Sequence, residues 1–214
     1  MPTSAPKRKN LTARERSKAI VRAAAEMVEK DGWDKLNMST LAKRTNITRQ
    51  LIYLHYPSVE ELMIATATYL FQTTYLDTLT AAGQFQEHGV AGVLTNAQNV
   101  TMDLPPGRAR ALLKIISTAF SEDSEMSHFA RRMRHLITNI WSPAVAEAFQ
   151  LEAKEAKSVA WLLVMAFWGG YQLMDDGDLS KEEAIERLNW LGTAIYKGSQ
   201  GREKQSATSL IKGK

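Results

Sequence analysis

Two short helical segments separated by about four residues constrain the fold more than any other feature of the sequence. Asn37 is a typical capping residue for the first segment, and residues 45–48 interrupt its pattern. Thr48 then caps a second segment over 49–56, which Pro57 stops because proline cannot continue a helix. These proportions are those of a helix-turn-helix, with the second segment in the recognition position.

Longer amphipathic patterns surround this pair. A helix is expected over 12–30, and capping boxes predict two further helix starts, at Ser58 with Glu61 and at Ser180 with Glu183. The last helix is expected to end near Tyr196. The intervening helical segments are separated by expected breakers at 89, 105–107, 142–143 and 175–177. No segment has the alternation of a strand, so the fold class is predicted to be all-α.

The charge is unevenly distributed along the 214 residues. Residues 1–60 hold 12 basic residues (Lys and Arg) and 6 acidic ones (Asp and Glu). Residues 61–196 hold 10 basic and 16 acidic residues, and residues 197–214 hold 5 basic residues and 1 acidic residue. A basic first segment favours a polyanionic partner such as nucleic acid, although charge runs are more often solvated surface. We expect disorder in a basic arm, 1–10, and a basic tail, 198–214.

Composition limits the classes of protein to which the chain could belong. The chain has no cysteine, no apolar run of about 18 residues and no apolar segment typical of a signal peptide. A cytoplasmic protein without a membrane partner is therefore expected. No nucleophile with a neighbouring base is visible, so no enzyme activity and no cofactor are predicted. His128 and His135 lie seven residues apart, which is too far for one metal ion, so no metal site is predicted.

Helix geometry predicts which face of the second short segment is exposed. At about 100° per residue, an inward Ile52 places Tyr56 about 40° away, so these two are expected to anchor the segment. The opposite side then carries Arg49, Gln50, Leu51, Tyr53 and Leu54. In a major groove, Arg pairs with guanine, Gln with adenine and Leu with the thymine methyl, while Tyr53 and His55 would contact phosphate. A protein contact through Leu51, Tyr53 and Leu54 would explain the same face.

The coupled motifs of this region resemble the amino-terminal DNA-binding domain of the TetR family of bacterial transcription regulators. They are the Leu-Ala at 41–42, the Ile-Thr at 47–48, the Tyr-x-His-Tyr at 53–56 and the Ser-x-Glu-Glu-Leu at 58–62. Three positions depart from the family pattern: Asn46 replaces a turn glycine, Gln50 a small residue, and Val59 a phosphate-binding lysine. The candidate DNA-binding residues are Asn37, Ser39, Thr48, Arg49, Gln50, Leu51, Tyr53, Leu54 and His55.

The resemblance implies a DNA-binding domain over 11–62 and a ligand-binding and dimerisation domain over 63–197. It implies a ligand-responsive regulator, specifically a repressor, that binds a palindromic operator in double-stranded DNA as a homodimer and responds to a small, largely apolar effector. The alternative is a helical interaction or ligand-carrier protein that uses its helix-turn-helix for protein contacts.

Two sets of residues are candidates for the second domain. Aromatic and methionine side chains could line a ligand pocket, although ordinary core would explain them equally: Tyr69, Tyr75, Phe120, Phe129, Met133, Trp141 and Trp161. The most hydrophobic helix pair could form a four-helix bundle across a two-fold axis, unless both helices are buried within one subunit. Its candidate interface residues are Met165, Trp168, Gly169, Gln172, Leu188, Leu191 and Ile195.

Overall fold

The computed structural model describes residues 12–82, 101–117 and 124–212, and it describes side chains as far as 74 in the first range and 200 in the last. The expected basic arm at 1–10 lies outside these residues, as does the expected breaker at Gly89. All regular secondary structure in the described ranges is helical, as the sequence predicts.

The helix-turn-helix forms where the caps predict it. Helix α1 spans Ala13–Asp31, and after the 3₁₀ turn η1 (Trp33–Lys35) come α2 (Met38–Thr45) and α3 (Arg49–His55). The Asn37 side chain accepts a hydrogen bond from the Thr40 amide at 2.9 Å, and the Thr48 hydroxyl accepts one from the Leu51 amide at 3.2 Å. Side-chain caps of this kind satisfy amides that the first turn of a helix leaves without partners.

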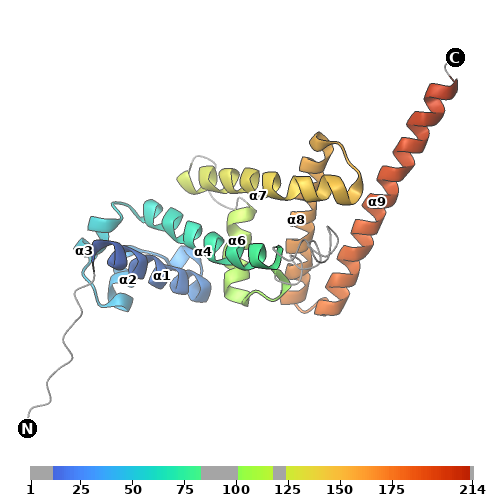
Figure 1. The fold of residues 1–214 in the computed structure, drawn as a ribbon. Helices are drawn as coiled ribbons and strands as arrows, with labels where there is room; N and C mark the ends of the chain where they lie inside the picture. The colour runs from blue at the N-terminus through green and yellow to red at the C-terminus, as the bar shows by residue number, and fades with distance from the viewer. Residues whose placement is uncertain (1–11, 83–100, 118–123, 213–214) are drawn as a thin grey trace, which may run out of the picture.

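In the ranges that the structure describes, five longer helices follow (Figure 1). They are α4 (Val59–Ala82), α6 (Pro106–Ile116), α7 (Glu125–Phe149), α8 (Ala153–Asp175) and α9 (Lys181–Lys212). Helix α4 leads from the α1–α3 head into the body, and α9 lies at the opposite end of the molecule from that head. The head and the last helix are therefore far apart, with α6, α7 and α8 between them.

One hydrophobic cluster connects the head to the body. It includes Ile20 of α1, Leu41 of α2 and Ile52 of α3, and continues through Leu70 of α4 to Ile115 of α6. The predicted apolar stripe of α1 is buried, and both α4 and α6 pack against α1. Helix α4 is continuous across residue 62 and the cluster extends past it, so the head and the body share one hydrophobic core.

Two predicted helix boundaries are wrong. Residues 142–143 were expected to break a helix, but α7 continues through Pro143. Proline cannot donate the backbone hydrogen bond to the Asn139 carbonyl, and the Ser142 hydroxyl donates a long 3.5 Å hydrogen bond to that oxygen instead. Buried Val145 and Phe149 hold the turns that follow.

Residues 198–212, expected as a disordered tail, continue α9. Extending an existing helix is easier than starting one, and good helix formers dominate residues 202–205.

The capping box at the start of α9 makes a testable contribution to stability. The Ser180 amide donates to the Glu183 carboxylate at 2.8 Å, and the Glu183 amide donates to the Ser180 hydroxyl at 3.1 Å. These bonds lower the pKa of Glu183 below its ordinary value of 4.5. A carboxyl with a lowered folded-state pKa stabilises the fold above its unfolded pKa, and this contribution is lost as the pH falls through the folded-state pKa.

We therefore expect Glu183→Gln to lower the free energy of unfolding at pH 7, and the difference from the wild type to shrink as the pH falls below about 4.5. Urea unfolding at pH 7 and at successive lower pH values measures both effects. The neighbouring Glu182→Gln, which changes the same charge without touching the box, is the control. A Glu183→Gln deficit that stays constant with pH would contradict the assignment.

Candidate nucleic-acid interface and cavity

Helix α3 is anchored as its periodicity predicts. Ile52 is fully buried, and the Tyr56 hydroxyl is hydrogen-bonded to the Ser17 hydroxyl of α1 at 2.6 Å. These two contacts fix the rotation of α3 against α1. The opposite side of α3 is consequently turned away from the protein.

The outward side of α3 presents chemistry suited to base edges. Arg49 and Gln50 are exposed, Tyr53 is 39% exposed and Leu54 is 77% exposed, which is high for a leucine. Leu51 and His55 are half-buried at the flanks. A guanidinium, an amide and an apolar side chain on one helix face match the donors, acceptors and thymine methyl of a major groove.

The turn before α3 depends on one residue with unusual backbone geometry. Asn46 has φ 53° and ψ 39°, the left-handed region, which asparagine enters more readily than other residues with a side chain. The departure from the family's glycine is therefore accommodated. Asn37 and Thr48 use their side-chain oxygens as helix caps, so they position α2 and α3. Ser39 of α2 is exposed, in keeping with its prediction as a contact.

The predicted DNA-binding set omits one cation on α2. Lys43 is exposed and lies four residues after Ser39, so both are on one side of the helix. Its neighbour Arg44 forms a 3.0 Å ion pair with Asp31, whereas Lys43 makes no ion pair within the described part of the chain. The i, i+4 spacing from Ser39 was the available sequence signal, and it adds Lys43 as a candidate phosphate contact.

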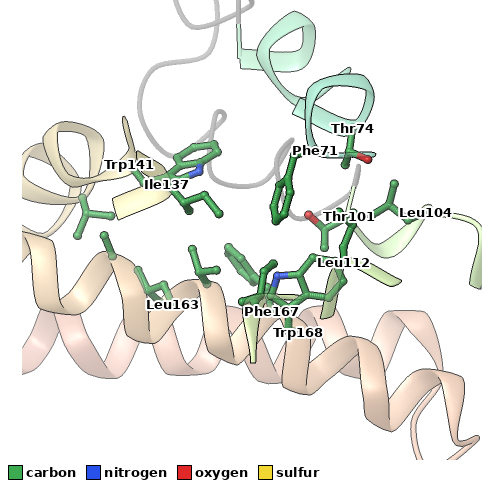
Figure 2. Close-up of a pocket in the computed structure, with 14 residues that line it drawn as sticks. Phe71, Thr74, Thr101, Leu104, Leu112, Ile137, Trp141, Leu163, Phe167 and Trp168 are labelled. Carbon is green, nitrogen blue, oxygen red and sulfur yellow. The ribbon is translucent and has the colours of Figure 1, made fainter. Parts of the chain in front are cut away.

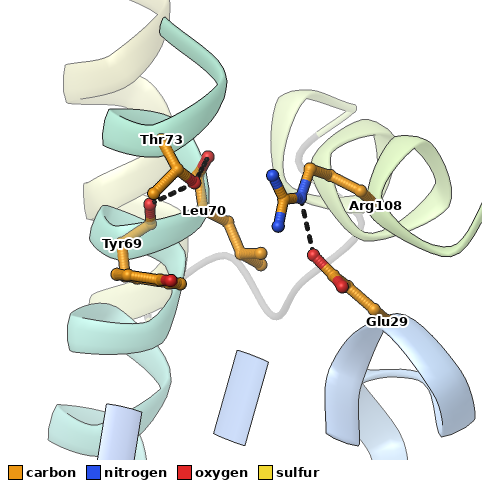
Figure 3. Close-up of polar contacts among 5 residues, drawn as sticks. All are labelled: Glu29, Tyr69, Leu70, Thr73 and Arg108. Atoms are coloured by element: carbon orange, nitrogen blue, oxygen red, sulfur yellow. Dashed lines mark hydrogen bonds and ion pairs between the residues drawn. The ribbon is translucent and has the colours of Figure 1, made fainter. Parts of the chain in front are cut away.

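Helix α6 is fastened to the end of α1 by three features. The Arg108 side chain reaches Glu29 at 2.6 Å, as Figure 3 shows, and the Trp33 indole donates to the Ala111 carbonyl at 3.0 Å in a buried bond. Between them, Gly107 lies so close to α1 that a Cβ there would be 2.1 Å from the Glu29 carbonyl oxygen. The head and the body therefore meet in a close contact between backbones.

The α4, α6, α7 and α8 helices surround an apolar cavity of about 110 Å³ (Figure 2). Trp141 and Ile137 of α7 lie at one end, and Thr74 and Thr101 lie at the other. The remaining lining residues are Phe71, Leu104, Leu112, Ile116, Val145, Ala160, Leu163, Val164, Phe167 and Trp168. Among these described side chains, the threonine hydroxyls and the two indole N–H groups supply the only polar atoms.

Only part of the predicted pocket set lines this cavity. Trp141 does, and buried Phe129 contacts the lining residue Phe71 with ring centroids 6.2 Å apart. Tyr69, Met133 and Trp161 are instead half-buried residues packed against the core. The Tyr75 side chain and Phe120 lie outside the described residues. Phe167 and Trp168 were missed because their segment is apolar nearly all round, so the sequence does not indicate which side faces the cavity.

The outer faces of α8 and α9 expose large apolar side chains. Leu162 is 64% exposed and Leu173 43% on α8, and Trp190 is 69% exposed and Tyr196 42% on α9. Proteins that remain monomeric seldom expose several such residues on adjoining helices. The packed pair α8 and α9 therefore carries a surface suited to a partner.

The predicted interface set lies only partly on that surface. Exposed Gln172 belongs to it, and a Cβ on half-buried Gly169 would meet no atom within 4 Å, so another helix could approach closely there. Met165, Leu191 and Ile195 are half-buried. Trp168 and Leu188 are 6% and 8% exposed, so they pack in the subunit's own core rather than on this outer surface.

In the part of the chain described here, no three His, Cys, Asp or Glu side chains gather where they could hold one metal ion. None of the described helices is long and apolar enough to span a bilayer.

Comparison with known proteins agrees with this geometry. Residues 20–66, which include α2 and α3, match the family model of bacterial regulatory proteins, tetR family. A transcriptional regulator from Rhodococcus sp. has the same fold, with a TM-score of 0.70 and 16% identity over 85% of this chain and 96% of its own. A TetR-family transcriptional regulator from Streptomyces coelicolor has a TM-score of 0.68 and 13% identity, over 89% of this chain and 99% of its own.

A third solved structure is the multidrug binding protein EbrR complexed with imidazole. It gives a TM-score of 0.61 and 16% identity over 88% of this chain and 97% of its own. At these identities the likeness establishes the fold. No curated protein matches the sequence.

Proposed function

We propose that the protein is a ligand-responsive transcriptional repressor, because its residues 20–66 match the family model of bacterial regulatory proteins, tetR family. Two subunits would bind the halves of a palindromic operator and block transcription until an effector enters the cavity. The proposal involves no catalytic step and no cofactor. It divides the chain into a DNA-binding domain, 11–62, and a ligand-binding and dimerisation domain, 63–197.

The observation that carries the proposal is the outward face of α3. Arg49, Gln50 and Leu54 are exposed together on a helix whose rotation is fixed by buried Ile52. A helix that faces only water has no need of this combination, whereas each of these side chains has a complementary group in a major groove. Tyr53 of α3 and the exposed Lys43 of α2 would contact phosphates.

A homodimer would place two such faces on one duplex. The exposed Leu162, Leu173, Trp190 and Tyr196 of α8 and α9 are the surface that we assign to the two-fold interface. This interface lies at the opposite end of the subunit from α3, so the two heads are separated by the bodies (Figure 1). Such separation suits half-sites about one helical turn of DNA apart or more.

The effector would act through α4 and α6. Phe71 of α4 and Leu112 of α6 line the cavity, and both helices pack against α1 of the head. An effector that fits the cavity better when these helices are displaced would favour the conformation with the wrong head spacing. The multidrug binding protein EbrR, which has this fold, is a precedent for small-molecule binding.

Selection of bound duplexes from a random DNA library at about 150 mM salt tests the proposal. We expect an enriched inverted repeat. Arg49→Ala and Gln50→Ala should each relax the preference at one position per half-site by about 1–3 kcal/mol, whereas Tyr53→Phe should weaken all duplexes alike.

The control is Arg132→Ala, which removes an exposed cation from α7 in the body and should leave the selected sequence unchanged. No enrichment by folded, dimeric protein would contradict the proposal. Enrichment of the same repeat by the Arg49 and Gln50 variants would show that α3 is not the reading helix.

A further inference from the structure

Among the residues that the structure describes, the lining of the cavity contains no charged group that could pair with an ion. Twelve of its fourteen lining residues are apolar and the other two are threonines. The three cations of α6 are directed elsewhere, since Arg108 pairs with Glu29, Arg110 with Asp175 and Lys114 with Asp34. An ion entering the cavity would lose its hydration and gain no opposite charge, which is strongly unfavourable.

The walls of the cavity favour a flat apolar molecule. Trp141 lies at one end, and Phe71 and Phe167 lie between it and the two threonines (Figure 2). Aromatic side chains bind rings through edge and offset contacts in addition to the apolar area that they bury. The volume of about 110 Å³ is comparable to that of a dry cavity of about 150 Å³ known to accept benzene. A ligand with one aromatic ring is therefore the expected size.

The two threonines allow one polar group on such a ring. Thr74 and Thr101 lie together at the end opposite Trp141, and a hydroxyl can donate one hydrogen bond and accept others. A hydroxyl or carbonyl on the ligand could thus share hydrogen bonds with them. A carboxylate or an ammonium group there would remain without a counter-charge.

We propose that the cavity selects a compact, uncharged aromatic effector, with its ring toward Trp141 and its polar substituent toward Thr74 and Thr101. The inference rests on the proposed function in taking this cavity as the effector site. It goes further by excluding organic cations and aromatic acids as effectors.

Three probes of one size test the charge selectivity on the full-length protein without DNA. They are benzyl alcohol, benzoate and benzylammonium, which share the ring and the one-carbon link and differ in charge. Titration by calorimetry and tryptophan fluorescence should show binding of benzyl alcohol, with both ions at least about 100-fold weaker. Trp141→Phe should reduce the fluorescence change and leave the part that Trp168 of the same cavity reports, whereas Trp161→Phe, a change on α8 outside the cavity, should leave the whole change.

A second variant tests the same chemistry in the opposite direction. Ile137→Glu places a carboxyl group on the half-buried cavity wall. It should therefore weaken the binding of benzyl alcohol and strengthen the binding of benzylammonium, each by at least about 10-fold. Circular dichroism establishes that the variant is folded. If benzoate or benzylammonium binds the wild type as tightly as benzyl alcohol does, or if no probe binds up to about 10 mM, the inference is overturned.

Measurement on the selected duplex separates this inference from the proposed function. Benzyl alcohol that binds the cavity selectively but leaves the affinity for the duplex unchanged would contradict ligand-responsive repression and support the charge selectivity. An ion that releases the duplex while benzyl alcohol does not would support the repressor and overturn the inference.

Discussion

Gly107→Ala is expected to destabilise the protein by about 3 kcal/mol or more, although alanine is the better helix former. The added Cβ would lie 2.1 Å from the carbonyl oxygen and 2.8 Å from the carbonyl carbon of Glu29, both backbone atoms that cannot rotate away. Helix α6 must then move off α1, which strains the Arg108–Glu29 ion pair and the buried bond from Trp33 to the Ala111 carbonyl. Urea unfolding of the wild type and the variant measures the loss.

Gly192→Ala is the matched control for this prediction. Gly192 also lies within a helix, but the nearest atom to its added Cβ is the Phe149 ring carbon at 4.0 Å. Helix propensity alone should therefore stabilise this variant by up to about 1 kcal/mol. If Gly107→Ala were as stable as the wild type, the close contact between α6 and α1 would not exist in solution.

The helix-turn-helix could be predicted from the sequence because its determinants are local. A cap such as Asn37 or Thr48 bonds an amide three residues later, and Pro57 directly follows the residue that caps the end of α3. The position of Ile52 on the buried side follows from the helical period, because Ile52 and Tyr56 lie only about 40° apart around the helix. Even the left-handed backbone at Asn46 follows from the side chain at that position.

The boundaries in the body depend on contacts that periodicity does not contain. Pro143 is tolerated in α7 because Val145 and Phe149 are buried beyond it, and that burial requires α8. The cavity poses the same difficulty. Trp141 was identified as a lining residue, but neighbouring Phe167 and Trp168 were not, because an apolar helix with buried residues on several faces gives no preferred direction.

The proposed dimer surface required the structure for a related reason. Leu188 and Trp190 are both large, apolar and close in sequence, yet one is 8% exposed and the other 69% exposed. A helix two residues further along has turned by about 200°, so they point to nearly opposite sides. The sequence indicates that α9 has two apolar faces, and only the packing of α8 and α9 shows which one the subunit uses itself.

If α8 and α9 form the proposed dimer interface, the double variant Leu162→Glu with Trp190→Glu should dissociate the proposed homodimer. Both side chains are among the most exposed apolar residues of α8 and α9, so in a single subunit they tolerate charge. Two-fold symmetry places each new carboxylate in the interface twice, where it has neither water nor a counter-charge. The dimer dissociation constant should rise by at least about 1,000-fold, as measured by analytical ultracentrifugation.

Binding to DNA should change in a manner that identifies the cause. Because each subunit keeps its own α3, affinity for a single half-site should be unaffected, whereas the gain from binding both halves of the repeat should disappear. Leu136→Glu, which adds the same charge at a 50% exposed leucine on α7, should leave both the dimer and its operator affinity intact. A double variant that remains dimeric at wild-type concentrations would place the interface elsewhere, and would require another explanation for the exposed Trp190 and Leu162.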